Sequence, residues 1–214
     1  MPKRITPPIT LPEYERLFRT LHAVALSERN APAKDSLFFA VAGAYLLKRH
    51  HRQASACPVA GGARYHLPAP IDFSMVFGTV QNDTLAADAD HFHCWIEVDG
   101  WIIDLMAPLF DEMAPAGRKG PAIPRFMFQK PAMAEAKAAP LETQAAYAHM
   151  PNNRLTTDLI NDFTKNPAYF DLVRVCDQWY ARPPRKMASS IGISDHTGTT
   201  KTVTLSPVRL VGAW

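Results

Sequence analysis

The sequence predicts an α+β domain in which a buried central helix packs against a mainly antiparallel β-sheet. Two helical patterns come first and strand-like runs follow, an order typical of α+β domains. The second helical segment, residues 37–47, has almost no polar side chain on any face, so it must be covered on all sides. We expect one domain over residues 1–214, with a core at 10–106 and a helical, loop-rich completion at 107–214 that ends in a strand.

The first helix is predicted to begin after Thr10, because Thr10-Leu11-Pro12-Glu13 has the pattern of a capping box with proline in the first turn. Apolar residues recur at helical spacing from Tyr14 to Ala25 and form one face to be buried. The helix should end before Pro32.

The buried second helix should begin at Asp35-Ser36, since both residues offer N-cap chemistry. It ends in four basic residues, 48–51, where the helix dipole favours cations. Ser36 is therefore predicted to lie at the N-terminus of a buried helix.

Four strand-like runs follow, at residues 63–67, 73–80, 91–98 and 101–106. Asp99-Gly100 is the pair most favoured in a two-residue hairpin turn between the last two runs. Further along, residues 107–151 are predicted to form loops with broken helix, 155–163 and 169–180 amphipathic helices, and 200–211 a strand interrupted by Pro207.

The hairpin brings a histidine and an aspartate together. Side chains alternate along a strand, so one face of the first strand carries His91, His93, Trp95 and Glu97. The turn sets Asp104 opposite Trp95 and diagonal to His93, within reach of a His–carboxylate hydrogen bond. Such a bond fixes the imidazole tautomer that a general base needs. The alternative is a half-buried strand histidine beside an edge charge.

The stretch from His93 to Asp104 resembles the transglutaminase-like signature of a histidine strand and an aspartate strand joined by a turn. The chain also resembles the small bacterial family DUF2026, assigned to the papain-like cysteine-proteinase superfold. The resemblance covers roughly residues 30–106. It implies a papain-like fold in which the nucleophilic cysteine is the first residue of the central helix. This chain has Ser36 at that position. Papain-like enzymes place a glutamine six residues before the nucleophile, and here that position is Asn30.

The resemblance implies a hydrolase or acyltransferase acting on an amide or ester. Ser36 would be the nucleophile or an oxyanion donor, His93 the general base and Asp104 its orienting partner, while Asn30 would complete the oxyanion hole. A hydroxyl is far less acidic than a thiol, so His93 would have to remove its proton during attack. Ser36 could instead only cap its helix.

The other cysteines give one alternative nucleophile. Cys57 lies in a loop-like, glycine-rich stretch between the helix and the sheet, whereas Cys94 and Cys176 have the surroundings of core residues.

Two other functional classes remain possible: a metal-dependent enzyme and a binding module without catalytic activity. His91, His93 and Glu97 share a strand face and could bind Fe, Mn or Zn; apart from that alternative we expect no metal and no cofactor. The domain could also be a catalytically inactive binding module, with Trp95 and Trp101 as flat contacts for a small molecule or peptide, unless these rings belong to the core.

Composition excludes several partners. The net charge is +3 and no run of Lys and Arg is dense enough for a nucleic-acid site. No apolar stretch is long enough to cross a bilayer, no signal-peptide pattern is present, and the three cysteines are scattered. We therefore expect a cytoplasmic protein without nucleic-acid or membrane partners; its oligomeric state does not follow from the sequence.

Overall fold

The computed structural model describes residues 6–29, 32, 35–81, 84–132, 147–181 and 187–214. It begins with the helices α1 (Leu11–Glu28) and α2 (Ser36–His50). The strands β1 (Cys57–Leu67), β2 (Phe73–Phe77), β3 (Thr79–Gln81), β4 (Thr84–Ala86), β5 (His93–Val98) and β6 (Trp101–Asp104) follow. The rest comprises the 3₁₀ turn η2 (Ala107–Leu109), α3 (Phe110–Met113), β7 (Phe126–Pro131), β8 (Tyr147–Pro151), α4 (Asn153–Lys165), α5 (Pro167–Tyr180), β9 (Ser190–Ser194), β10 (Thr200–Thr204) and β11 (Gly212–Ala213).

The predicted α+β class with a mostly antiparallel sheet is confirmed. The main sheet has the order β11-β7-β6-β5-β1-β2, and β8 also pairs with β1. Its pairings are antiparallel except for that of β11 with β7. β1 is the strand that joins the parts of the sheet, because it pairs with β5 through residues 57–61, with β8 through 61–65 and with β2 through 63–67.

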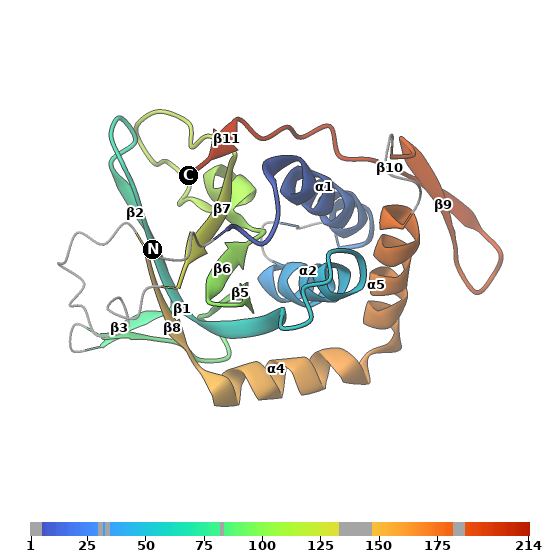
Figure 1. Cartoon of the computed structure of the whole chain (residues 1–214), viewed down its shortest axis with the longest axis horizontal. Helices are drawn as coiled ribbons and strands as arrows, with labels where there is room; N and C mark the ends of the chain where they lie inside the picture. Colours follow the sequence, from blue (N-terminus) through green and yellow to red (C-terminus); the bar gives the residue numbers. More distant parts are fainter. Residues whose placement is uncertain (1–5, 30–31, 33–34, 82–83, 133–146, 182–186) are drawn as a thin grey trace.

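The predicted buried helix is α2, which lies with α1 on one side of the sheet (Figure 1). Gly43 marks a close approach to the sheet: a Cβ atom there would lie 2.4 Å from Cδ1 of Leu105 and 2.8 Å from Cδ1 of Ile96. α5 packs against both helices, and α4 runs below β1 in the same view. The N-terminus of α1 has the predicted capping box between Thr10 and Glu13.

The predicted hairpin is confirmed in position and register. Val98 pairs with Trp101 and Ile96 with Ile103 across the turn. Asp99 and Gly100 have φ angles of 48° and 78°, the left-handed conformation that a type I′ turn requires at both central positions.

Two predictions about the fold are wrong. Residues 107–151 contain the strands β7 and β8, although this stretch was expected to hold loops and broken helix. Cys57 begins β1 and does not lie in a loop, because the glycine-rich stretch after it is extended and pairs with β5 and β8. In the described part of the chain, no helix is long and apolar enough to cross a membrane.

Candidate active site

The His–Asp pair predicted from the hairpin is present at the first residue of β5 and the last residue of β6. Nε2 of His93 lies 2.8 Å from Oδ2 of Asp104, and both side chains are buried, with 1% and 0% of their surface exposed. The backbone amide of Met106 donates to the other carboxylate oxygen, Oδ1, at 2.8 Å. Burial opposes ionisation of Asp104, but the His93 charge and the hydrogen bonds from His93, Tyr65 and Met106 outweigh it and lower the pKa of Asp104.

Two residues that the sequence analysis missed extend this pair. The Tyr65 hydroxyl, from β1, lies 2.5 Å from Oδ2 of Asp104 and 2.9 Å from Nε2 of His149, from β8. Burial is the main cause that lowers the pKa of His149 to about 3 and raises the pKa of Tyr65 well above its usual value. Tyr65 stood in a predicted strand, but nothing local in the sequence indicates which distant carboxylate it meets.

Aromatic rings surround the pair on the sheet face that carries His93. The half-buried Phe77 ring stacks on the His93 ring, with centroids 4.3 Å apart and an interplanar angle of 20°. Tyr65 contacts His93, Phe110, Phe128 and Trp214 with centroid separations of 6.0, 4.8, 5.1 and 5.7 Å. The imidazole is therefore shielded from solvent, and Phe77 lies over it.

Ser36 is the first residue of α2, and Asp35 occupies the N-cap position, so the interpretation of Ser36 as the N-cap residue is wrong. The Ser36 hydroxyl is near the thiol of Cys94, the residue that follows His93 in β5, and partly offsets the rise in the pKa of that thiol. Cys94 is buried on the face that packs on α2, and burial is the main cause that raises its pKa to about 12. Among the hydrogen bonds of the described residues, none joins Ser36 to His93.

The remaining candidates lie apart from the pair or outside the described residues. Cys57 pairs with Glu97, four residues from His93 along β5, which is about 13 Å at the rise of a strand. Burial, followed by the charge of Glu97, raises the pKa of the Cys57 thiol, which disfavours the nucleophilic thiolate.

Trp95 and Trp101 are buried in the core, 1% and 8% exposed. Asn30 lies outside the described residues.

The structure separates the three residues of the alternative metal site. His91 precedes β5, is exposed, and lies 3.2 Å from a carboxylate oxygen of Asp88. His93 is bound to Asp104, and Glu97 accepts a hydrogen bond from the indole of Trp95 at 3.2 Å. Within the described ranges, no three His, Cys, Asp or Glu side chains form a group that could hold a metal ion.

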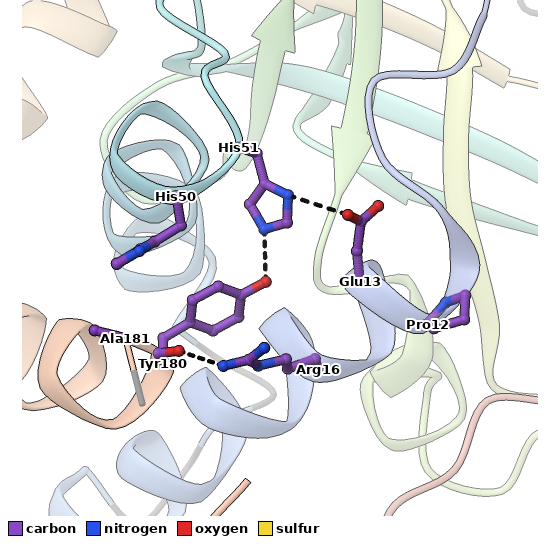
Figure 2. Close-up of a pocket in the computed structure, with 7 residues that line it drawn as sticks. All are labelled: Pro12, Glu13, Arg16, His50, His51, Tyr180 and Ala181. Atoms are coloured by element: carbon purple, nitrogen blue, oxygen red, sulfur yellow. Dashed lines mark hydrogen bonds and ion pairs between the residues drawn. The ribbon is translucent and has the colours of Figure 1, made fainter. Parts of the chain in front are cut away.

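A separate hollow of about 490 Å³ lies where α1, α2 and α5 meet. It is lined by Pro12, Glu13, Arg16, His50, His51, Tyr180 and Ala181. Figure 2 shows the His51 ring between Tyr180 and Glu13, at 2.6 Å from the phenol oxygen and 3.6 Å from the carboxylate. The Arg16 guanidinium lies over the Tyr180 ring, 4.4 Å from its centroid. Because α2 has 15 residues, this hollow and Ser36 are separated by about 22 Å of helix.

The fold and the pair together define an α+β protein with a buried His–Asp site between two strands of an antiparallel sheet. The family described as "Protein of unknown function (DUF2026)" matches residues 10–214, and the chain belongs to this family. A solved structure described as "The crystal structure of genomics APC5867" is 30% identical, with a TM-score of 0.81 over 99% of this chain and 100% of that one. No curated protein matches the chain.

Proposed function

We propose that this protein is a hydrolase or acyltransferase of the papain-like cysteine-proteinase superfold that uses a serine, Ser36, in place of the nucleophilic cysteine. The observation that carries the proposal is the buried 2.8 Å contact between His93 and Asp104 at the start of β5 and the end of β6. Ser36 also interacts with Cys94, so the first residue of the buried helix lies beside the histidine strand, on the face opposite to the His93 ring.

Asp104 holds Nε2–H of His93, which leaves Nδ1 as the nitrogen that can accept a proton. His93 and Cys94 point to opposite faces of β5, so the first turn of α2 must rearrange to bring the Ser36 hydroxyl to Nδ1. Its oxygen then bonds to the carbonyl carbon of an ester or amide while its proton passes to His93. The oxyanion formed from the carbonyl faces the backbone N–H groups at the start of α2.

Collapse of this intermediate breaks the bond to the leaving alkoxide or amine, which takes the proton from His93. Water or an acceptor nucleophile then attacks the acyl-serine and regenerates the Ser36 hydroxyl. Because His93 is 1% exposed, substrate reaches it only after the stacked Phe77 ring moves aside.

A fluorophosphonate probe tests this chemistry, since attack by a serine oxygen expels fluoride and leaves a stable phosphonyl ester. Intact-mass spectrometry with peptide mapping should find the label on Ser36, with labelling abolished in Ser36→Ala and reduced at least about 100-fold in His93→Gln. Ser55→Ala, which changes an exposed serine bonded to Asp99, is the matched control and should be labelled as the wild type is. Absence of label on Ser36, or equal labelling of His93→Gln, would contradict the proposal.

The second candidate function is a binding module that keeps the fold without turnover. It is favoured by the near-complete burial of His93 and Asp104 and by the stacked Phe77 ring over them. This function predicts that the probe labels neither the wild type nor Ser36→Ala, whereas an acyl-transfer enzyme gives the contrast described above.

A further inference from the structure

The pair of His93 and Asp104 belongs to a longer chain of hydrogen bonds that crosses four strands. From β8 to β5 the links are 2.9 Å between His149 and Tyr65, 2.5 Å between Tyr65 and Asp104, and 2.8 Å between Asp104 and His93. These strands are brought together by β1 and by the β5–β6 hairpin, so the chain depends on the assembled sheet.

The positions of the protons in this series of hydrogen bonds follow from which groups can donate and which can only accept. An ionised carboxylate can only accept, so the Tyr65 hydroxyl donates to Asp104. The Tyr65 oxygen can then accept from His149, which requires the proton of His149 to be on Nε2. Nδ1 of His149 is consequently a bare acceptor, and this buried atom has no hydrogen-bond partner among the described residues.

The charge of Asp104 explains why several residues join this hydrogen-bond network. A carboxylate in an apolar core is strongly destabilising unless donors surround it. Asp104 receives three, from His93 and Tyr65 on Oδ2 and from the Met106 amide on Oδ1. Since Oδ2 accepts from both His93 and Tyr65, the Tyr65 hydroxyl constrains the direction in which that oxygen faces the imidazole.

We infer that Tyr65 and His149 are positioning residues that hold the Asp104 carboxylate against Nε2 of His93 and so keep Nδ1 of His93 available as the base. This role rests on the proposed function and deepens it. His149 acts through Tyr65, because its Nε2–H donates to the phenol oxygen and directs the phenol proton toward Asp104.

The test is ¹⁵N NMR of histidine-labelled protein, which reports the tautomer of each imidazole without any turnover. In the wild type at pH 8, His149 should be neutral with its proton on Nε2, and Nε2 of His93 should carry the proton that faces Asp104. Tyr65→Phe keeps the ring packing and removes only the hydroxyl. In that variant we expect His149 to become a mixture of tautomers and the Nε2–H of His93 to exchange with water at least about tenfold faster.

Tyr147→Phe is the matched control. It removes a hydroxyl from β8, the strand that carries His149; this hydroxyl donates to the Pro131 carbonyl at 2.7 Å and does not touch Asp104. It should leave both tautomers and the exchange of His93 unchanged. Unchanged histidine signals in Tyr65→Phe, or a wild-type His149 protonated on Nδ1, would overturn the inference; the second result requires no folded variant.

Fluorophosphonate labelling separates this inference from the proposed function. If both hold, labelling of Ser36 in Tyr65→Phe should be slower by about 10- to 100-fold. If the tautomers change as expected while the wild type is never labelled, the positioning role is supported and acyl transfer is rejected. If Ser36 is labelled and Tyr65→Phe is labelled as fast as the wild type, the positioning role is rejected.

Discussion

At the scale of single residues, the site is organised around one buried anion. Asp104 lies where polar groups are most destabilising, yet its two carboxylate oxygens together accept hydrogen bonds from three donors. Tyr14 adds a hydrogen bond from its hydroxyl to the Asp104 carbonyl. The residue is thus held at its side chain and its backbone, which is the kind of support that a precisely oriented pair requires.

Asp104→Asn should lower the free energy of unfolding by about 3 kcal/mol, because an amide nitrogen would face donors and the His93 ring would lose its anionic partner. Urea unfolding followed by circular dichroism measures this change. Asp158→Asn, on the exposed surface of α4, should change stability by less than about 0.5 kcal/mol. Equal stability of Asp104→Asn and the wild type would mean that the carboxylate is not ionised in the native protein.

His149 should make the protein sensitive to acid. The pKa of His149 falls from 6.5 to about 3 on folding, mainly because the ring is buried, so the unfolded chain binds the additional proton between these values. The contribution of His149 to the stability of the folded state is present above pH 6.5 and is lost as the pH falls toward 3. The lowered pKa of Asp104 acts in the same direction as its carboxylate becomes protonated.

Replacement of His149 by glutamine, which does not titrate and can still donate to Tyr65, should flatten the dependence of stability on pH between 6.5 and 3. Urea midpoints at a series of pH values measure the slope. His196→Gln, in an exposed turn, should leave the slope as it is in the wild type. A slope unaltered in His149→Gln would show that folding does not lower the pKa of this ring.

At the scale of elements, the parts that could be predicted are those with local signals. The capping box, the apolar segment of α2 and the Asp99-Gly100 turn each determine structure within a few residues, and the hairpin then determines the His93–Asp104 pair. β7 and β8 have no such signal, since they are short and lie in a stretch rich in Ala, Pro and Met. Tyr65 and His149 were missed for the same reason: their contacts depend on pairings between distant strands.

The close pairing of β1 with β8 leaves no space for a side chain at Gly61. A Cβ atom there would lie 2.1 Å from the Met150 carbonyl oxygen, which is backbone and cannot rotate away. Gly61→Ala should therefore destabilise the protein by about 3 kcal/mol, measured by thermal unfolding. Gly192→Ala, in the peripheral β9, meets only a methyl group of Thr200 and should cost less than about 1 kcal/mol. A similar loss of stability in the two variants would contradict this account of the close pairing between β1 and β8.

At the scale of the whole molecule, the last residues of the chain complete the structure around its first helix and the site. His22 in α1 lies 2.9 Å from the Ser206 hydroxyl, and Arg19 donates to the Ser206 carbonyl at 2.6 Å. β11 extends the sheet beside β7, and the ring of Trp214 packs between Phe110 and Phe128. The sequence predicts a strand over 200–211, whereas the structure has β10 at 200–204 and β11 only at 212–213. That this segment covers the rings of Phe110 and Phe128 was not predicted.

Trp214→Ala should lower the free energy of unfolding by about 2 kcal/mol, because a large ring that is partly buried against Tyr65 and Phe128 is lost. Differential scanning calorimetry gives the change. Val211→Ala is the control, since that side chain is 68% exposed, and it should leave the melting temperature within about 1 °C of the wild type. A small effect at Trp214 would indicate that the aromatic cluster is stable without its outermost ring.

The contacts between Ser206 and α1, 184 residues apart for His22, have a consequence for how the protein matures on the ribosome. During synthesis, α1 and the hairpin emerge long before the segment that covers them, and β1 has no β8 partner until residue 147 has been made. A nascent chain therefore carries a stretch of β1 without its β8 partner, and rings of the site without Trp214, until the later segments have been made. Many of the contacts in this fold join distant residues, and such contacts form only after the segments between them have been made.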